Sequence, residues 1–572
     1  METQVGRSLV LYLPGLSQLG ARPPSFHGGH RTDLCFPGQV ENAIEIAWNA
    51  SSDAALKAQA FEYINQLRAD PQAWQVCATL FTKTPRTSEV VRLVSLEVVN
   101  NAVQAQVLEM ASLAFLKEAL LDYARRTYTG SAEEQIDPPG LQNKLAQTLT
   151  YLYTHMYKAG WEDFIDDFLA LTRLPNSAQR DNPAGVILCL RVLGSVHDEI
   201  ADVFVSRQGN EAKRNTDLKD TIRARDMHNI ARFLQDVLAQ YHNQGDQILE
   251  TTLRVIGKWV AWIDISLMIN QDMLNLLLPL VGRTSSAGSD DKVRDAAIDA
   301  FTEIVGKKMK PADKIEMISF LNLRDIVSQL IASPPLRDFQ STPRYDTDLA
   351  ESVAKLVNVA MSDVVRVLED GELGDDVRAR AEQLLHDFLP LLLRFFSDEY
   401  DEVCSSVIPS LADLLTFLRK VTALPESYLA ILPPILNAII MKMRYDETST
   451  WGIEDEQTDE AEFLELRKRL QNLQKSIAAV DQNLYIDVLS NLVATTFQNL
   501  EQQGAQMDWR DLDLALHEMN LFGELALPNQ GVTRSKRPST NASERLVVIM
   551  RKMVESSTSA RPRDPLSEPR GC

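Results

Sequence analysis

Several features that are common in enzymes and secreted proteins are scarce in this sequence. Its 572 residues include five cysteines, which lie far apart and show no paired spacing typical of a metal site or a disulfide framework. The sequence therefore indicates a reducing compartment, the cytosol or the nucleus. Glycine and proline number only 24 and 25, and the stretches between them are rich in Leu, Ile, Val and Ala. This composition favours helices.

Catalytic signatures are also missing. The sequence contains no phosphate-binding loop, no dinucleotide-binding glycine motif, no nucleophile elbow and no zinc-binding helix motif. The stretch LHEMN around His517 has the first two letters of a zinc helix but lacks its second histidine, and the eight histidines of the chain are scattered. We therefore expect a protein that is not an enzyme and that has no catalytic residue, cofactor or metal site.

Long apolar runs are absent as well. The most apolar stretch, RVIGKWVAWIDISLMIN from Arg254 to Asn270, is interrupted by Lys258 and Asp264, whereas a membrane span needs roughly 20 predominantly apolar residues. We expect no membrane insertion. Helical spacing gives this stretch a broad apolar face that includes Trp259, so we predict one helix buried among neighbours. Asp264 at its edge is expected to cap or pair rather than to catalyse.

Negative charge dominates the sequence. The chain has 79 Asp and Glu against 58 Lys and Arg, a formal charge of −21, which argues against a general nucleic-acid coat but leaves room for a local basic groove. Residues 446–465 carry nine acids and no Lys or Arg. This acidic loop, with Glu454, Asp455 and Glu456 at its centre, is expected either to be merely solvated or to act by charge on a basic partner or on RNA.

Four segments of the chain begin alike, at Glu89, Asp291, Asp375 and Asp401. Each opens with an acid, has Val two residues later and returns apolar residues ten and fourteen positions after the acid, and three of the four have an arginine after the Val. This pattern is typical of the inner helix of a HEAT-type repeat, in which the acid and the arginine pair with equivalents in adjacent repeats. Such a helix cannot bury its apolar face alone, so we predict an all-α solenoid of stacked repeats.

The length requires several domains or one extended array, because a single core stops growing at about 250–300 residues. At ~40–47 residues per repeat, residues 41–555 hold about a dozen helical pairs. Residues 1–40 have no sustained helical period and many breakers, so we expect a disordered or spurious leader there. Residues 556–572 are again rich in breakers and are expected to lie outside the array.

Motifs spread over this body resemble the importin-β superfamily. The stretch ENAIEIAWNASSDAALKAQAFEYINQLRADPQAWQVCATLF, from Glu41, resembles the superfamily's amino-terminal repeat, and its ending is similar to that of the exportin-T family, the tRNA exportins. The stretches KWVAWIDISLMIN and RFFSDEYDEVCSSVIPSLADLL also resemble this family, in its fungal branch. The resemblance covers Glu41 to Ser556, and family members are considerably longer. It implies the amino-terminal half of an exportin followed by an unrelated tail.

The resemblance implies a nuclear export receptor that binds tRNA together with Ran in its GTP form. Such a receptor passes the nuclear pore by contacts with pore proteins and shuttles between nucleus and cytoplasm. We expect it to be a monomer. Two alternatives stay open, namely a receptor for another RNA or a protein cargo, and a HEAT-repeat scaffold with no role in transport.

Candidate site residues follow from the same resemblance and from local charge. The family's Ran-facing inner helices imply contacts on the segment from Glu89, at Arg92, Glu97, Asn100 and Asn101. The alternative is that Arg92 belongs to the packing of the repeats and that Glu97 is solvated. The basic groups that suit RNA are Lys307, Lys308, Lys310, Arg419 and Lys420. For the lysines the alternative is a structural role, because a helix dipole favours cations at its carboxyl end.

Overall fold

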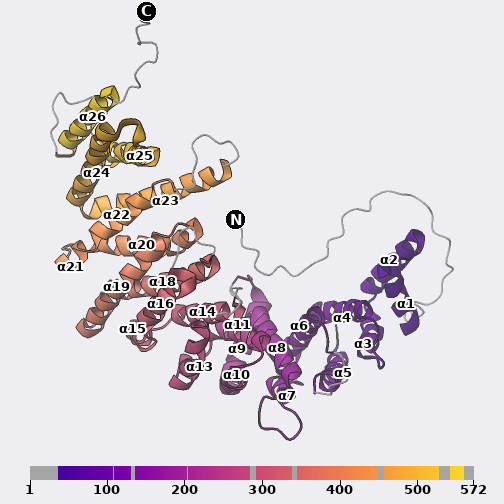
Figure 1. Cartoon of the computed structure of the whole chain (residues 1–572). Coiled ribbons are helices and arrows are strands. Elements are labelled where there is room, and N and C mark those ends of the chain that lie inside the picture. The colour runs from indigo at the N-terminus through magenta and orange to yellow at the C-terminus, as the bar shows by residue number, and fades with distance from the viewer. Residues whose placement is uncertain are drawn as a thin grey trace, which may run out of the picture. The chain divides into compact units, whose positions relative to one another are not determined.

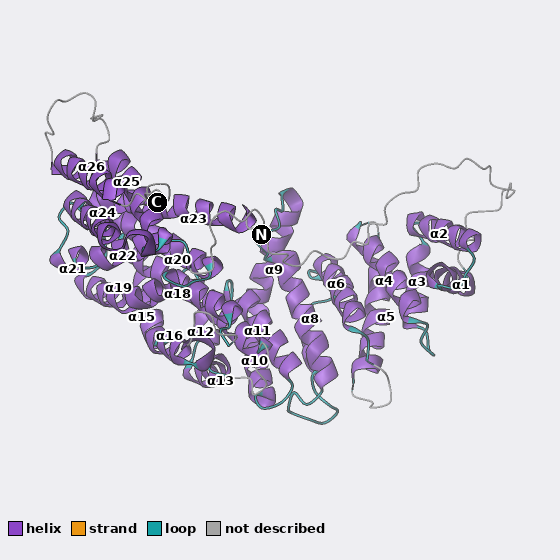
Figure 2. Cartoon of the chain, turned by 45° about the horizontal axis from the view of Figure 1, so that its top comes forward, coloured by secondary structure: helices purple, strands orange, loops and turns teal. Residues whose placement is uncertain are grey.

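The protein is all-α in the part that the structure describes. A computed structural model describes residues 36–106, 108–129, 136–202, 204–283, 291–337, 344–446, 457–526 and 541–559. These residues form helices and short connections and contain no strand (Figure 2). The predicted fold class is confirmed. The described residues fall into two compact units, of which unit 1 comprises residues 36–123 and 137–156, and unit 2 the rest.

Unit 1 is built from the first helices of the chain. They are α1 (Pro37–Trp48), α2 (Ala54–Ala69), α3 (Ala73–Thr82), α4 (Glu89–Gln104), α5 (Met110–Tyr128), which contributes residues to both units, and α6 (Pro139–Met156). Within unit 1, α1 packs against α2, α3 and α4, and α4 packs against α3 and α6. The core is continuous along these contacts because each helix buries aliphatic side chains on the side that faces its neighbours.

Unit 2 continues with helices of the same kind (Figure 1). Up to residue 337 they are α7 (Phe164–Leu171), α8 (Pro183–Ile200), α9 (Gly209–Arg225), α10 (Met227–Tyr241), α11 (Asp246–Val260), α12 (Ile265–Met268), α13 (Gln271–Val281), α14 (Lys292–Gly306), α15 (Pro311–Phe320), α16 (Leu323–Ala332) and α17 (Pro334–Arg337). From residue 347 they are α18 (Thr347–Leu368), α19 (Asp375–Phe396), α20 (Asp401–Lys420), α21 (Glu426–Leu429), α22 (Leu432–Lys442), α23 (Gln457–Val480), α24 (Gln482–Gln503), the 3-10 turn η2 (Gly504–Gln506), α25 (Trp509–Ala526) and α26 (Asn541–Ser559).

Two layers of helices run through unit 2. Helices α8, α11, α14, α18, α20 and α23 form one row, in which each helix packs against the next. Helices α7, α10, α13, α15, α19 and α22 each pack against at least one member of that row. This arrangement of paired helices stacked on their neighbours is the solenoid that the periodic sequence predicts.

Aspartate side chains begin two of the row helices, α14 and α18, and join them. Asp291 accepts hydrogen bonds from the first amides of α14, and Asp346 does the same for α18. Arg294 of α14 also reaches Asp346, with 2.7 Å between its Nη2 and the carboxylate. An arginine of one repeat therefore pairs with the acid that precedes the next row helix, as the ladder predicted from sequence requires.

The row does not contain all four of the similar segments. Helices α14 and α20 lie in it, but α19, which begins at Asp375, lies in the covering layer, where it packs on α18, α20 and α22. Its Arg378 donates to the carbonyl oxygens of Leu368 and Asp370 instead of joining the ladder. Because α18 and α20 pack directly on each other in the row, α19, which lies between them in the sequence, is left to the covering layer.

The sequence suggested one helix for the apolar stretch from Arg254 to Asn270, but the structure divides this stretch between two helices. Helix α11 ends at Val260, a turn follows, and Asp264 caps the short α12 by accepting the amide of Ser266 at 3.0 Å. The capping role expected for Asp264 is therefore confirmed. Trp259 is fully buried, as predicted, and its indole N–H donates to the carbonyl oxygen of Leu193 at 3.1 Å.

Three boundaries differ from those expected. Helix α1 begins at Pro37 and buries Val40 completely, so the array starts before residue 41. Helix α26 runs on to Ser559 with Ser556 fully buried, so it continues beyond residue 555. Helix α23 begins at Gln457 and takes up the second half of the expected acidic loop. Acidic residues are compatible with the first turn of a helix because its dipole favours them there.

Two further observations limit the kinds of site that the described residues form. None of the helices among them is long and apolar enough to cross a membrane. The same part of the chain contains no cluster of His, Cys, Asp and Glu that could hold a metal ion.

Cys189 and Cys404 are buried, and this burial raises the pKa of both thiols to about 12.

Candidate partner-binding surfaces

Arg92 lies on α4 but is buried inside unit 1. Its guanidinium group donates to the carboxylate of Asp137 and to the hydroxyl of Tyr123, and that hydroxyl lies 2.7 Å from Asp137 Oδ2. The side chain of Asp137 is fully buried and that of Arg92 is 6% exposed. Burial, and then the charge of Asp137, raise the pKa of Tyr123. The structure therefore favours the packing role of Arg92 over contact with a partner.

Asn100 is also an interior residue. It is 1% exposed, and its side-chain amide donates to Thr148 Oγ1 at 3.0 Å. The ammonium group of Lys144 donates to the side-chain oxygen of Asn100 at 3.2 Å and to that of Gln147 at 3.1 Å. Asn100 therefore joins α4 to α6, and it presents no group to a partner.

Glu97 and Asn101 remain at the surface of unit 1. They lie four residues apart on α4 and share one side of it. Glu97 pairs with Arg68 of α2 at 3.0 Å, with both side chains about one-third exposed (35% and 37%). Lys144 lies nearby, and burial lowers its pKa while the charge of Glu97 opposes that change. We call Arg68, Glu97, Asn101 and Lys144 the α4 polar row.

Lys307, one of the lysines suited to RNA, has a structural position. It follows the last residue of α14, and its ammonium group donates to the carbonyl oxygens of Val260, Ala261 and Ile263 at 2.8, 3.1 and 2.8 Å. These carbonyls belong to the end of α11 and the turn after it, where no further helical amide follows. Burial lowers the pKa of Lys307, and the charge of Asp264 opposes this change. The structure thus favours the alternative in which this lysine closes a helix.

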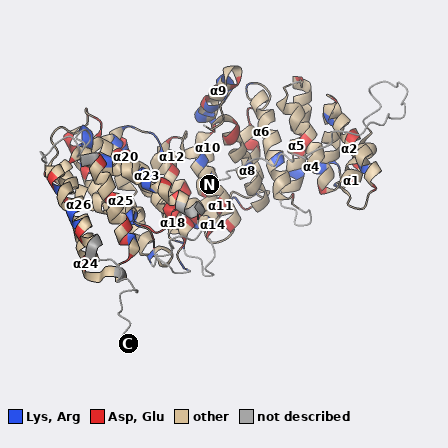
Figure 3. Cartoon of the chain, turned by 90° about the horizontal axis from the view of Figure 1, so that it is seen from above, with Lys and Arg blue, Asp and Glu red and all other residues tan. Residues whose placement is uncertain are grey.

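The other basic candidates lie at the surface of unit 2. Lys308 and Lys310 are exposed in the connection between α14 and α15, and Arg419 is exposed in the last turn of α20. Lys420 is exposed too, but it pairs with Glu369 at 2.8 Å. Basic and acidic residues are interspersed along the helices (Figure 3). Lys308, Lys310 and Arg419 are therefore the members of the predicted set that are best able to meet phosphate.

The central residues of the acidic loop, Glu454, Asp455 and Glu456, lie outside the described residues. The prediction for them stays a prediction. Arg467 of α23, after the loop, is buried and pairs with Asp513 of α25 at 2.6 Å. Nearby, Arg444 pairs with Asp508 and Asp511 at 2.8 and 2.6 Å. The pairs of Arg444 thus join the chain just before the loop to the start of α25, and the pair of Arg467 joins α23 to α25.

One groove was not found from the sequence. It lies between α10 and α13, has a volume of about 450 Å³ and is lined mostly by polar side chains. Arg232 and Asp272 are exposed on its two walls, and Asp236 pairs with Arg180 at 3.3 Å. Helical spacing predicts only that the polar residues of α10 and of α13 lie on solvated faces. The sequence does not indicate that the two helices are neighbours, so the groove was not predicted. The groove is open and polar, and these features alone identify no ligand.

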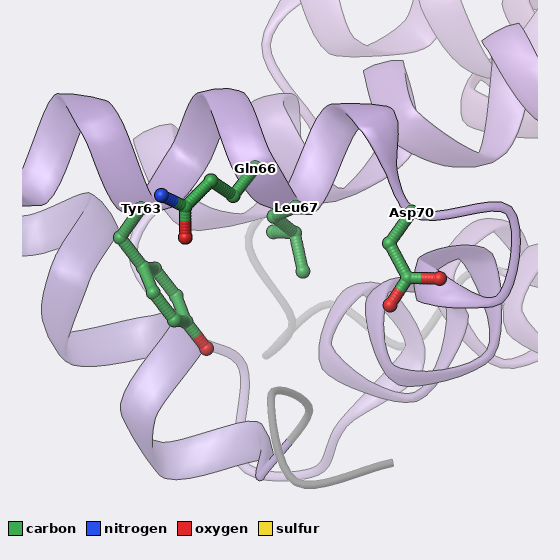
Figure 4. Close-up of a pocket in the computed structure, with 4 residues that line it drawn as sticks. All are labelled: Tyr63, Gln66, Leu67 and Asp70. Atoms are coloured by element: carbon green, nitrogen blue, oxygen red, sulfur yellow. The ribbon is translucent and has the colours of Figure 1, made fainter. Parts of the chain in front are cut away.

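A second hollow, along α2, is too small for a substrate. It is lined by Tyr63, Gln66, Leu67 and Asp70 (Figure 4). Its volume is about 10 Å³, room for one water molecule at most. Small-molecule sites usually have volumes of about 300–1,000 Å³ and apolar walls. Neither hollow has both properties, so extended surfaces are the better candidates for function.

Comparison with known proteins supports the predicted resemblance. Residues 375–565 match the family model described as Exportin-T, and residues 138–301 match the model described as Exportin 1-like protein. Over 91% of its length the chain is 68% identical to Exportin-T of Chaetomium globosum and 67% identical to Exportin-T of Pyricularia oryzae. It is 61% identical to Exportin-T of Botryotinia fuckeliana over the same share.

The chain spans about half the length of the curated relatives it matches, 50% for the Chaetomium globosum protein. This agrees with the expectation that family members are considerably longer. A solved structure titled "Importin13 cytosolic state" has the same fold, with a TM-score of 0.53 at 12% identity over 78% of this chain and 51% of that one. The resemblance to fungal exportin-T sequences is confirmed.

Proposed function

We propose that this chain, homologous to Exportin-T over 91% of its length, acts as a nuclear export receptor for tRNA. In this proposal the whole receptor, of which the chain spans about half the length, binds tRNA together with Ran in its GTP form, passes the nuclear pore by contacts with pore proteins and shuttles between nucleus and cytoplasm as a monomer. The observation that carries the proposal is the 68% identity to a protein named Exportin-T. The chain itself performs no chemistry and needs no cofactor.

The stacked repeats supply a physical basis for joint binding. Each helical pair of a solenoid contacts mainly its neighbours, so small changes between pairs add up along the array. If Ran and tRNA favour the same arrangement of the pairs, each raises the affinity of the other by one coupling free energy. Hydrolysis of GTP releases the ordered switch segments of Ran and so removes this coupling.

The α4 polar row is the Ran-binding surface that the structure supports best. Of the four residues predicted for Ran, Asn101 is exposed and Glu97 partly exposed, whereas Arg92 and Asn100 are enclosed by their neighbours. A charged residue at the edge of a protein interface, the position proposed here for Glu97, affects mainly the association rate of the partner and the salt dependence of that rate. Reversal of this charge, Glu97→Arg, should therefore slow the association of Ran more at low salt than at high salt.

For tRNA we propose contacts at Lys308, Lys310 and Arg419. They are exposed cations in a chain of net charge −21, so each phosphate contact has to come from a local group of this kind. Neutralising phosphates releases counterions, and the logarithm of the binding constant therefore falls linearly with the logarithm of the salt concentration. Loss of one phosphate contact should lower that slope by about 0.7–0.9.

The experiment compares Lys308→Glu/Lys310→Glu with the control Lys213→Glu/Lys475→Glu, which makes the same charge change at two other exposed lysines. Binding of tRNA and of an unrelated duplex RNA is titrated at several salt concentrations. We expect the first variant to bind tRNA at least tenfold more weakly with a smaller salt slope, and the control to change little. If both variants lose the same amount of tRNA affinity, the loss comes from the change in net charge, and the proposed contacts at Lys308 and Lys310 are refuted. Equal affinity of the unaltered chain for both RNAs would refute a specific tRNA receptor.

A further inference from the structure

The row helices α11, α14, α18 and α20 follow one another along unit 2 (Figure 1). Arg294 in the first turn of α14 pairs with Asp346, which caps the start of α18, so these two helices begin side by side. Lys307, just after α14, donates to the carbonyl oxygen of Val260, the last residue of α11. An ion pair also joins the ends of α18 and α20. The row therefore has one edge formed by helix starts and another formed by helix ends.

Acidic residues mark the edge of helix starts. Each of the four helices has an aspartate at its first position or immediately before it, at Asp246, Asp291, Asp346 and Asp401. The positive end of a helix dipole favours this charge. We call these four residues the acidic edge.

Exposed cations lie at the opposite edge, where the same helices end. Arg223 comes from α9 and donates to the carbonyl oxygen of Trp262, just after α11, at 3.1 Å. Two lysines follow α14, and one arginine lies in the last turn of each of α18 and α20. We call basic edge the five exposed residues Arg223, Lys308, Lys310, Arg366 and Arg419.

Buried contacts hold the cations of the basic edge next to one another. Arg223 and Lys307 both donate to carbonyl oxygens at the end of α11 or in the turn after it. Lys314 of α15 donates to the carbonyl oxygen of Lys307 at 2.6 Å and pairs with Asp363 of α18 at 2.7 Å. Arg366 shares the carboxylate of Asp363 at 2.5 Å. One chain of contacts thus joins α9 to α18 along the basic edge.

The helix dipole alone does not account for these cations. Its effect is confined to the last turn of a helix, whereas Lys308 and Lys310 lie beyond the last residue of α14 and Arg223 belongs to another helix. The nearby acids leave positive charge over, because Asp363 is shared by two cations. Asp220, which pairs with Arg223, is 65% exposed, and such surface pairs contribute little. The basic edge therefore has positive charge available to an external partner.

The length of the basic edge fits a line of phosphates. Packed helices lie 8–10 Å apart, so the three intervals between four helices give an edge of roughly 25–30 Å. A nucleic-acid backbone carries regularly spaced negative charges over such a length. The guanidinium group of arginine binds phosphate with two parallel hydrogen bonds.

We propose that the basic edge binds the phosphate backbone of RNA, with Arg223 and Arg366 among its contacts, and that the acidic edge keeps RNA away from the opposite side of the row. This inference rests on the proposed function. It extends the contacts proposed there, at Lys308, Lys310 and Arg419, to α9 and α18.

The first experiment compares Arg223→Gln/Arg366→Gln with the control Arg324→Gln/Arg380→Gln. The control makes the same charge change at two exposed, ion-paired arginines of α16 and α19, outside the row. Binding of tRNA and of an unrelated duplex RNA is titrated at several salt concentrations. We expect the first variant to bind both RNAs at least tenfold more weakly, with a salt slope lower by about 1.4–1.8 for two lost phosphate contacts. Unchanged binding, or an equal loss in the control, would overturn the proposal.

A second measurement uses the unaltered chain and so does not depend on how well a variant folds. Lysines are acylated and arginines are modified with phenylglyoxal, with and without saturating RNA, and the sites are quantified by mass spectrometry. Lys308 is compared with Lys292, which is exposed at the start of the same helix, and Arg366 with Arg324. We expect RNA to slow modification of Lys308 and Arg366 at least fivefold and to leave the other two unchanged. Equal protection at both edges would contradict a one-sided track.

The two RNAs separate this inference from the proposed function. If tRNA binds but protects neither Lys308 nor Arg366, the basic edge is refuted while the receptor function stands. If both RNAs bind equally well along the basic edge, the inference holds and a specific tRNA receptor is refuted. Binding of neither RNA would overturn both. Displacement of RNA by polyglutamate at equal charge concentration would also overturn the inference, because the occupant would then be an acidic protein segment.

Discussion

The ammonium nitrogen of Lys307 lies 2.8 Å from the carbonyl oxygen of Val260, across the contact between α14 and α11. Both residues lie at helix ends, where the backbone leaves carbonyl groups without amide partners. One lysine from one repeat thus completes the helix of the preceding repeat. Its position in a group of three lysines suggested RNA binding, but its contacts bind two repeats together.

Loss of Lys307 should therefore destabilise the protein locally. Lys307→Met leaves partly buried carbonyl oxygens without donors, which costs about 1–3 kcal/mol. The matched control, Lys308→Met, changes an exposed neighbouring lysine and should leave stability unchanged. Hydrogen exchange of the amides around Val260 should accelerate in the first variant only. Unchanged exchange in Lys307→Met would mean that water replaces the ammonium group at no cost.

The pair formed by Arg92 and Asp137 predicts a larger effect. Arg92→Met leaves the fully buried carboxylate of Asp137 without its main partner, and breaking such a pair costs about 3–5 kcal/mol. In the double variant Arg92→Met/Asp137→Leu both charges are absent, so it should cost less than the sum of the single changes. The measurement is urea unfolding of the 572-residue chain, in which hydrogen exchange of the α4 and α6 amides reports on unit 1. Additive costs would show that the two side chains are not coupled.

The same pair bears on partner binding. If Arg92 is structural, Arg92→Met should reduce Ran binding only as far as it unfolds α4, and lower temperature should restore binding. Glu97→Arg should weaken binding with only a small loss of stability, because Glu97 is partly exposed and a surface ion pair such as the one with Arg68 contributes about 0–1 kcal/mol. A variant at Arg92 that remains fully folded yet loses Ran would contradict this assignment.

Glu518 predicts a dependence of stability on pH. It is fully buried on α25, and both its oxygens lie 2.9 Å from the amide nitrogen of Gln474. Burial raises its pKa from 4.5 to about 7, against the opposing effects of Gln474 and Arg467. Between these two values the folded state holds more protons than the unfolded state, so stability falls as pH rises through this window. The total is of order 3 kcal/mol.

The variant Glu518→Gln isolates this effect. It should be about as stable as the unaltered chain below pH 4.5 and more stable above pH 7, because it has no buried charge. His517 acts in the opposite sense, since burial lowers its pKa, but it is present in both proteins and cancels in the comparison. Glu524→Gln, an exposed change on the same helix, is the control. An equal pH dependence with and without Glu518 would show that this carboxyl titrates normally.

The sequence was sufficient for the fold because apolar periodicity and capping residues are local signals. The repeat pattern of Asp291 and Arg294 predicted both the start of α14 and a contact to the next repeat, which the structure shows at Asp346. The same signals did not distinguish the two layers, since α19 and α20 begin with similar residues but pack differently. Which layer a helix joins depends on its partners along the chain, and a single segment does not contain that information.

The surfaces were harder to predict because exposure depends on neighbours far away in sequence. Arg92 and Asn100 share α4 with Glu97 and Asn101, yet α5 and α6 enclose the first two. Lys307 differs from Lys308 only in facing the end of α11. In each case the residues lie on the same helix or side by side in the sequence, and the packed neighbour decides whether the residue is structural or available to a partner.

The central claim, that this chain belongs to a receptor that couples Ran and tRNA, is tested most directly by one titration. Ran loaded with a non-hydrolysable GTP analogue is titrated into the 572-residue chain, with and without saturating tRNA. The same titration is made with a version extended by the unmatched half of the Chaetomium globosum protein. Coupling requires both ligands to select one state of the array, and two linked contact areas bind far more strongly than either alone. We expect weak Ran binding that tRNA barely changes in the shorter chain, and cooperative binding in the extended one. No Ran binding to either version would contradict the account, and strong cooperativity in the shorter chain would place the whole cargo site within it.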